Sequence, residues 1–262
     1  MRVKEYIAHE LIGTPLENLA KGVRDLADLP RRIGHPELRE IYVEPARAEL
    51  AMSRLIEPSM NCIDVGAHLG SVLNLINRLA PHGNHFAIEP IPYKSKWLQQ
   101  KFPHVRVSSV ALSNTEGQAS FYVHHHLSGF SGLAFHSSGK ETDLRVDVID
   151  VKLDKLDNII PSDVPIGFIK LDVEGAELLV LKGSEQVLKN HRPSLLFECS
   201  KTGLKTHKVD AKEIYHFFCD LDYNIFLIKD WLAGGEYLNC EKFLKSMEYP
   251  FQAFNYLAIP QS

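Results

Sequence analysis

From residue 61 onward the chain alternates short apolar runs with segments of helical periodicity, and this alternation limits the fold more than any other feature. The runs NCIDV, HFAIE and VRVSSV are separated by SVLNLINRLA and YKSKWLQQKF, and GFIKLDV, PSLLFEC and YNIFLI continue the pattern. Strands that alternate with helices form right-handed βαβ units and a parallel sheet. The sequence therefore predicts an α/β fold built on a mostly parallel sheet.

Four segments are assigned separately. Residues 1–58 show helical spacing, and PARAELAMSRLI begins with Pro45, which suits a first helical turn, so this segment is interpreted as an N-terminal helical cap. Residues 118–150 contain two strand-like runs around a stretch rich in glycine and serine, which predicts an inserted hairpin. AELLVLKGSEQVLKN is predicted as one helix, and FQAFNYLAI as a closing edge strand.

Composition and charge exclude several classes of protein. A formal net charge of -4 gives no global reason to expect nucleic acid as a partner. The 4 cysteines have no C-x-x-C spacing, which argues against a zinc knuckle or a disulfide framework. The N-terminus lacks a signal-like apolar stretch, and no run approaches the roughly 20 apolar residues that span a bilayer. We expect a cytoplasmic protein without a transmembrane segment, and a homo-oligomer is left open.

The stretch IDVGAHLG joins a buried strand to a helix through a glycine turn. In open parallel sheets ligands bind outside the carboxyl ends of the strands, where Asp64 lies. Gly66 would let a ligand lie against the main chain, and Gly70 would let the next helix begin close to the sheet. Glu89 ends the next strand, where a carboxylate can accept hydrogen bonds from both ribose hydroxyls. The two acids together predict an adenosine ligand.

The glycine pattern favours one adenosine ligand over another. Dinucleotide sites use G-x-G-x-x-G to hold a pyrophosphate, but His68 interrupts that pattern here. S-adenosylmethionine, which has no phosphate, fits better, with Asp64 and the turn facing its methionine part and Glu89 its ribose. A nicotinamide-dependent oxidoreductase and a non-catalytic binding module with the same fold are the alternatives.

Four stretches, IDVGAHLG, AIEP, SSVALSNTEGQASFYV and GFIKLDVEGAELLVLKGSEQVLKNHRPSLLFE, together resemble the FkbM family of S-adenosylmethionine-dependent methyltransferases. The resemblance covers residues from about 61 to 200. It implies a seven-stranded, Rossmann-like class I methyltransferase fold, with residues 59–262 as the cofactor-binding domain after the helical extension. It also implies methyl transfer to a hydroxyl of a sugar, glycolipid or secondary metabolite, a small-molecule or glycan acceptor.

The resemblance also implies roles for individual residues. Asp64, Gly66 and Gly70 match the cofactor turn, with His68 inside it, and Glu89 matches the ribose acid. Asp172, Glu174 and Gly175 match the motif after the fourth strand of the family. Many class I methyltransferases hold the adenine amine with an acid after strand three, where this chain has Ser108, Ser109 and Val110. The adenine contact is therefore assigned to the backbone near Val110 or to Asn114.

The chemistry of methyl transfer points to the acids near the cofactor. The sulfonium is already a good leaving group, so the protein must align the acceptor and remove its proton. Asp172 is the leading candidate for orientation, proton removal or binding of a divalent metal, and its alternative role is a helix cap. Glu198 ends the next strand and is predicted to join it, because neighbouring carboxylates raise one pKa or bind Mg²⁺. Glu177 is interpreted as a first-turn helix acid.

The triplet His124, His125 and His126 cannot bind one metal from a strand, because neighbouring side chains point to opposite faces. A polar strand end that leads into a loop is the preferred interpretation. His125 and His68 are nevertheless kept as candidate general bases, because imidazole titrates near neutrality. Phe130 and Phe135 in the same loop are candidate walls for the acceptor.

Overall fold

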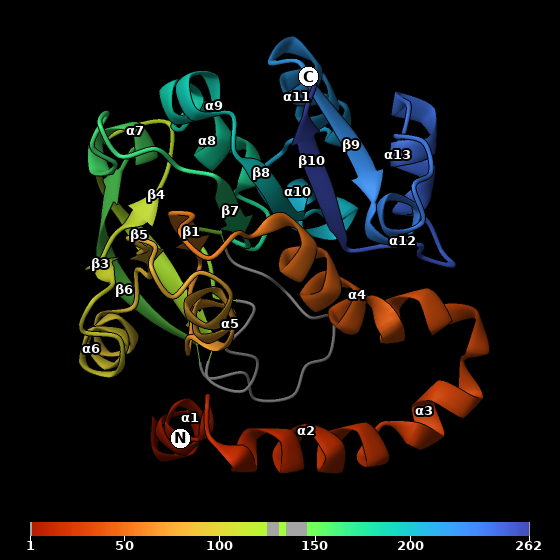
Figure 1. Cartoon of the computed structure of the whole chain (residues 1–262), viewed down its shortest axis with the longest axis horizontal. Coiled ribbons are helices and arrows are strands. Elements are labelled where there is room, and N and C mark those ends of the chain that lie inside the picture. Colours follow the sequence, from red (N-terminus) through yellow and green to blue (C-terminus); the bar gives the residue numbers. More distant parts are fainter. Residues whose placement is uncertain (1, 125–130, 135–145, 262) are drawn as a thin grey trace.

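The computed structural model describes residues 2–124, 131–134 and 146–261. One seven-stranded sheet organises the chain, in the order β3-β2-β1-β7-β8-β10-β9 (Figure 1). Every neighbouring pair is parallel except the two that involve β10. The predicted α/β class and mostly parallel sheet are confirmed. The strands are β1 (Cys62–Val65), β2 (Phe86–Ile88), β3 (Arg106–Ser108), β7 (Phe168–Leu171), β8 (Ser194–Glu198), β9 (Tyr223–Leu227) and β10 (Asn255–Pro260).

Helices cover both faces of this sheet, so β1 and β7 at its centre are buried at every position. Cys62 of β1 packs in a cluster with residues of α4, α5 and α12, whereas its neighbour Ile63 packs on the other face with residues of α8, α9 and α11. Successive strand residues point to opposite faces, and a strand buried on both therefore appears as a continuous apolar run. The helices after the N-terminal segment are α5 (Ser71–Leu79), α6 (Pro92–Lys101), α7 (Leu156–Ile159), α8 (Glu177–Lys182), α9 (Glu185–His191), α10 (Lys201–Thr206), α11 (Ala211–Asp220), α12 (Ile228–Leu232) and α13 (Cys240–Ser246).

The N-terminal segment is helical, as its spacing predicts. α4 packs on the sheet through Ala51 and Met52, while the preceding helices form an arch that stands away from the domain (Figure 1). The predicted helix start at Pro45 is wrong, because Pro45 lies inside α4. Pro45 is exposed, so the carbonyl group that loses its helical partner can bond to water. These helices are α1 (Arg2–Leu11), α2 (Pro15–Ala27), α3 (Leu29–Gly34), the short 3-10 helix Pro36–Leu38 and α4 (Arg39–Leu55).

The predicted insertion is a hairpin of β5 (Gly117–His124) and β6 (Val146–Asp154), which pair antiparallel along eight residues. β4 (Ala111–Leu112) pairs with β6 and completes a small three-stranded sheet beside the main one. The candidate base His125, and also His126, Phe130 and Phe135, lie outside the described residues.

Two further expectations are corrected. β10 does not close the edge of the sheet but lies between β8 and β9, so that β9 is the edge strand. Its alternating pattern identified a strand but carried no information about its neighbours. The segment 176–190 forms two helices, α8 and α9, because the chain breaks at Gly183. A Cβ at Gly183 would lie 2.1 Å from the carbonyl oxygen of Ser113, so the backbone there is pressed against a neighbouring loop.

All four cysteines are free thiols, and Cys62 and Cys199 are buried, which agrees with their place in apolar runs. Among the helices of the described residues, none combines the length and the apolarity needed to cross a bilayer.

Candidate active site

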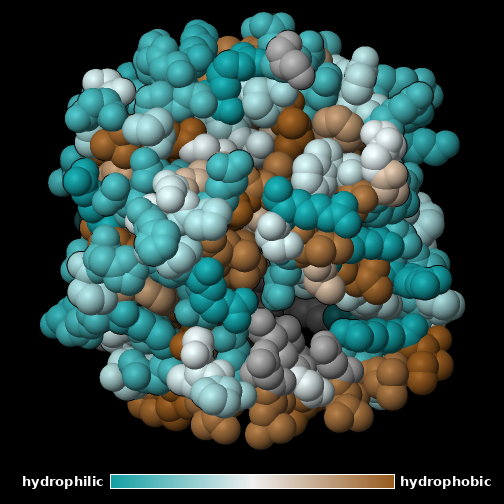
Figure 2. Space-filling view, viewed as in Figure 1, coloured by the Kyte–Doolittle hydropathy of each residue, from teal (hydrophilic) through white to brown (hydrophobic). Residues whose placement is uncertain are grey.

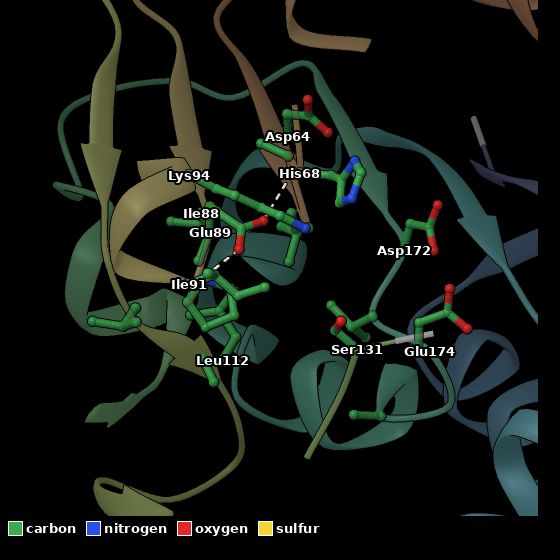
Figure 3. A pocket seen from close by; sticks show the side chains of 18 of the residues that line it. Asp64, His68, Ile88, Glu89, Ile91, Lys94, Leu112, Ser131, Asp172 and Glu174 are labelled. Carbon is green, nitrogen blue, oxygen red and sulfur yellow. Dashed lines mark hydrogen bonds between the residues drawn. The ribbon is translucent and has the colours of Figure 1, made fainter. Parts of the chain in front are cut away.

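A cavity of about 260 Å³ lies where β1, β2 and β7 end at their carboxyl termini (Figure 3). The turn after β1 forms one wall, the segment after β2 a second, and the segment after β7 a third. Ser131 and Leu133, from the described part of the insertion, complete it. The residues predicted from the sequence that line this cavity are Asp64, Gly66, His68, Glu89, Val110, Asp172 and Glu174.

The glycine turn after β1 is held in contact with β7 by close backbone packing. A Cβ at Gly66 would lie 1.9 Å from the carbonyl oxygen of Asp172, and its φ of 80° is in the left-handed region. Gly70 precedes α5 with a φ of 92°, and a Cβ there would meet Leu98 and Phe102 of the neighbouring helix. The two glycines therefore bring the turn close enough to both neighbours for its backbone to form the cavity wall.

Glu89 connects the two strand ends through its carboxylate. One oxygen accepts a hydrogen bond from the backbone N–H of His68 at 2.9 Å, and the other accepts from the backbone N–H of Ile91 at 2.9 Å (Figure 3). The side chain is buried, and burial raises its pKa to about 6. Each carboxylate oxygen has a second lone pair. Glu89 can thus organise the turn and still accept hydrogen bonds from a ligand.

Lys94 places a cation beside that carboxylate, which the sequence did not indicate. The side chain is fully buried, its amino group lies next to Glu89, and its positive charge opposes the burial effect on the Glu89 pKa (Figure 3). Its Nζ lies 3.7 Å from a carboxylate oxygen of Glu5 in α1. The hydroxyl of Tyr93 donates to the other Glu5 oxygen at 3.0 Å. The N-terminal helix is therefore in electrostatic contact with the cavity wall.

Asp64 is buried at the end of β1, where it pairs in register with Lys170 of β7. Burial raises the pKa of Asp64 to about 7, and the positive charge of Lys170 opposes this effect. Its Oδ2 has no hydrogen-bond partner in the described part of the chain. A buried carboxylate oxygen that lines a cavity and has no partner suits a cationic or hydrogen-bonding group of a ligand.

A chain of polar contacts extends from α4 to the acid at the end of β7. Glu44 of α4 accepts hydrogen bonds from the backbone N–H and side-chain amide of Asn255, each at 3.1 Å. Lys170 donates to Asn255 Oδ1 at 3.3 Å and lies 3.5 Å from Asp172 Oδ2. Lys170 and Asp172 thus form an ion pair at the end of β7. Asp172 is thereby held against the edge of the cavity, where its side chain is 35% exposed.

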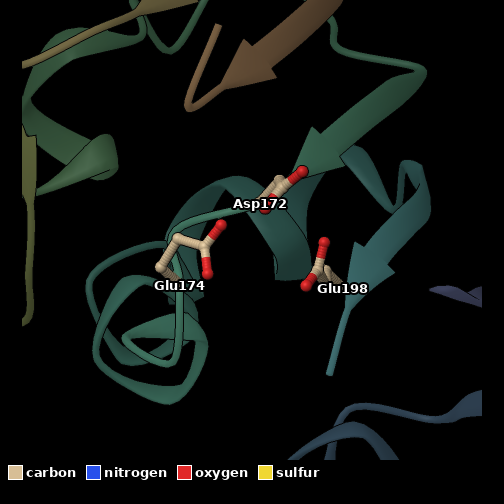
Figure 4. Close-up of side chains that lie close together, drawn as sticks. All are labelled: Asp172, Glu174 and Glu198. Atoms are coloured by element: carbon tan, nitrogen blue, oxygen red, sulfur yellow. The ribbon is translucent and has the colours of Figure 1, made fainter. Parts of the chain in front are cut away.

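Three carboxyl groups gather beside this edge of the cavity: Asp172, Glu174 and Glu198, which have oxygens within 4.8 Å of one another (Figure 4). Asp172 and Glu174 line the cavity, whereas Glu198 lies outside the lining residues. The predicted pair of Asp172 and Glu198 is thus close in space, and Glu174 is a third member. Glu174 adopts a positive φ of 56°, which turns its side chain toward the pair. Glu177 stabilises this turn, since its Oε1 accepts from the backbone N–H groups of Val173 and Gly175.

Burial and mutual repulsion hold protons on this acidic cluster. The pKa of Glu198 is raised to about 9, first by burial and then by the charge of Asp172, while Lys170 opposes the rise. The same two causes raise the pKa of Glu174 to about 8. Without a bound cation the cluster therefore carries protons near neutral pH, and binding of a divalent metal would release them.

The raised pKa of Glu198 predicts a pH-dependent stability. An acid whose pKa is higher in the folded than in the unfolded protein contributes most to stability at low pH. This contribution falls once the pH exceeds the pKa of the unfolded state, and it is lost as the pH rises through the folded-state pKa of about 9. Glu198→Gln should therefore increase the free energy of unfolding by about 1–2 kcal/mol near pH 8.5, with a smaller gain near pH 5. Thermal unfolding at both pH values tests this, with exposed Glu236→Gln as control. An equal gain at both pH values would contradict the assignment.

The remaining candidates lie in different places. Burial and the charge of Lys94 lower the pKa of His68 to about 3, so this histidine is neutral and a weak base. Asn114 is exposed and lies outside the residues that line the cavity, where Val110, Ala111 and Leu112 form the apolar wall. His124 is buried at the end of β5.

A family model described as the methyltransferase FkbM domain matches residues 64–225, from the acid of the glycine turn to β9. The chain belongs to the FkbM methyltransferase family. Its sheet order and glycine turn are those of class I methyltransferases, a fold that implies S-adenosylmethionine as the methyl donor. The family resemblance seen in the sequence is confirmed.

Solved structures give weaker likenesses. An FkbM methyltransferase from Methylobacillus flagellatus is 18% identical with a TM-score of 0.49, and the match covers 78% of this chain and 44% of that one. A TehB-like SAM-dependent methyltransferase from Corynebacterium glutamicum is 12% identical with a TM-score of 0.42, covering 94% and 97%. The chain thus spans less than half the length of the Methylobacillus protein. No curated protein sequence matches it.

Proposed function

We propose that the chain transfers a methyl group from S-adenosylmethionine to a hydroxyl oxygen of a sugar, glycolipid or secondary metabolite. The observation that carries this proposal is the cluster of Asp172, Glu174 and Glu198 beside a cavity with the family's cofactor turn. A hydroxyl is a poor nucleophile until its proton is removed, whereas an amine can attack as the free base. Carboxylates at the acceptor end of the cavity suit a hydroxyl acceptor.

The lining of the cavity supports one orientation of the cofactor. The apolar wall of Val110, Ala111 and Leu112 suits the adenine ring, and Glu89 suits the two ribose hydroxyls. The methionine part then lies along the glycine turn, with Asp64 available to its ammonium group. In this orientation the sulfonium methyl faces Asp172, and the acceptor enters from the side of the acidic cluster.

Asp172 is proposed to orient the acceptor hydroxyl and to take its proton as the new carbon–oxygen bond forms. The ammonium of Lys170 lies 3.5 Å from Asp172 Oδ2 and holds this carboxyl group at the edge of the cavity. Glu174 and Glu198, with their raised pKa values, then act as hydrogen-bond donors or proton acceptors next to it. The protein's contribution is thus alignment and proton removal.

A divalent cation such as Mg²⁺ also suits the cluster. The three carboxyl groups have oxygens within 4.8 Å of one another, and carboxylate oxygens are among the ligands that Mg²⁺ prefers. Asp172, Glu174 and Glu198 would hold the ion, whose chemistry there would be to lower the pKa of a bound hydroxyl.

Calorimetric titration with S-adenosylhomocysteine, with and without Mg²⁺, tests the proposed cofactor site, and NAD serves as the comparison ligand. We expect binding of the thioether in the micromolar range without metal and no binding of NAD. If metal occupies the acidic cluster, Mg²⁺ should bind on its own, release protons and leave the affinity for the thioether nearly unchanged. Tight binding of NAD or no binding of the thioether would contradict the proposal.

A further inference from the structure

The N-terminal arch, defined as residues 2–34, carries an apolar face that is exposed. In α2, Leu16, Leu19, Val23 and Leu26 are 56%, 65%, 61% and 71% exposed, and their spacing puts them on one side of the helix. Nine of the 13 exposed large hydrophobic side chains among the described residues belong to this arch. The other five are Val3, Tyr6, Ile7, Leu29 and Ile33.

This face points away from the domain. Figure 2 shows an apolar band along the lower edge of the molecule, where Figure 1 places α2 and α3. Helices on a protein surface ordinarily bury their apolar side against the core and expose their polar side. The inner side of α1 instead makes polar contacts, Glu5 with Lys94 and Tyr93 and the His9 ring with the carbonyl oxygen of Leu69 at 2.8 Å. Of the exposed hydrophobic residues of the arch, Tyr6 also contacts the domain, since its ring lies 5.2 Å from that of Trp97. The arch is therefore fixed to the domain with its apolar side outward.

The shape of the arch favours a flat partner over a second copy of the chain. The arch bows outward in Figure 1, and its apolar band follows the convex side in Figure 2. Two convex ridges would touch over a small area, whereas a stable protein–protein interface buries more than about 1,000 Å². A lipid surface can meet the whole ridge, because headgroups and acyl chains adapt to it.

The charges of the arch favour an anionic surface. Its sequence has six lysines and arginines against five aspartates and glutamates, whereas the whole chain has 29 against 33. The formal balance of the arch is therefore +1, whereas that of the whole chain is -4. A basic balance in an amphipathic helical segment is typical of binding to anionic lipids.

The arch also lies on the catalytic side of the sheet. The arrowhead of β9 points toward it in Figure 1, and β1, β7 and β8 run in the same direction. We propose that the outer face of the arch docks on an anionic lipid bilayer, with the carboxyl ends of the strands turned toward the headgroups. Docking does not depend on the identity of the methyl acceptor, so its test is separate from that of the proposed function.

Co-sedimentation of the full chain with vesicles tests this proposal, with phosphatidylcholine alone compared with phosphatidylcholine mixed with phosphatidylglycerol. We expect the chain to bind the mixed vesicles. Binding to phosphatidylcholine alone should be weaker, and high salt should weaken binding to the mixed vesicles. The double variant Leu19→Asn/Leu26→Asn should bind the mixed vesicles at least about tenfold more weakly than the unmodified chain. The control Leu50→Asn/Val148→Asn changes exposed apolar residues outside the arch and should bind as the unmodified chain does.

Light scattering and titration with S-adenosylhomocysteine complete the test. Both double variants should bind the thioether as the unmodified chain does, which shows that the domain is folded. The proposal is overturned if the unmodified chain does not sediment with either vesicle, or if both double variants lose binding equally. A dimer that becomes monomeric in Leu19→Asn/Leu26→Asn would assign the face to a second copy of the chain instead.

Discussion

Glu89→Ala is expected to weaken the binding of S-adenosylhomocysteine at least about a hundredfold. The carboxylate would accept hydrogen bonds from both ribose hydroxyls, and hydrogen bonds to a charged group contribute more to the binding free energy than hydrogen bonds between neutral groups. The substitution also removes the acceptors for the backbone N–H groups of His68 and Ile91, so the turn keeps only its backbone hydrogen bonds from Gly66 and Ala67 to the carbonyl oxygen of Ile88 in β2. Calorimetric titration measures the loss.

Two further variants separate the causes. Glu89→Gln keeps one acceptor oxygen but turns an amide donor toward a backbone N–H group, so its affinity should fall between those of the unmodified chain and the alanine variant. Glu57→Ala removes an exposed glutamate and should bind normally. A folded Glu89→Ala variant with normal affinity would mean that the ribose lies elsewhere.

The side of the cavity that carries the glycine turn could be predicted because its geometry is encoded locally. Asp64, Gly66 and Glu89 lie at strand ends, and a glycine is required where the backbone of one strand end meets that of another. Such constraints act over a few residues and leave a motif. The same reasoning gave the strands and their parallel arrangement, since burial on both faces makes a strand continuously apolar.

The rest of the site depends on contacts that no local pattern carries. Lys94 interacts with Glu5, 89 positions away, and Glu44 bonds to Asn255, 211 positions away. In the sequence Lys94 is one lysine among several near the start of a helix, and its burial between Glu89 and Glu5 comes from the tertiary fold. Glu174 was expected to match a motif, but its positive φ decides that it joins the acidic cluster.

The arch and β10 show the limits of periodicity. The spacing of Leu16, Leu19, Val23 and Leu26 predicts a helix, but a periodic pattern does not say whether the apolar face meets the core or the outside. In the same way, the alternation in FQAFNYLAI predicts a strand without its neighbours, and the antiparallel insertion of β10 between β8 and β9 comes from the tertiary fold.

Asp172→Asn is expected to leave the affinity for S-adenosylhomocysteine within about threefold of normal and to slow methyl transfer about a thousandfold. Asparagine has the shape of aspartate, so the backbone contact of Asp172 with Gly66 is preserved, but it cannot take a proton. Single-turnover transfer from labelled cofactor to an active acceptor measures the rate, with exposed Asp163→Asn as control. A rate near normal would exclude Asp172 as the base.

A double-variant comparison then tests whether the acidic cluster acts as one unit. Asp172→Asn and Glu198→Gln should each slow transfer, and the combined variant should be little slower than Asp172→Asn alone, because groups that handle one proton together are strongly non-additive. Effects that multiply would mean that the two carboxyl groups act in separate steps. If a divalent cation binds there, added Mg²⁺ should speed transfer in the unmodified chain and lose that effect in either single variant, because each removes one of the three carboxyl groups.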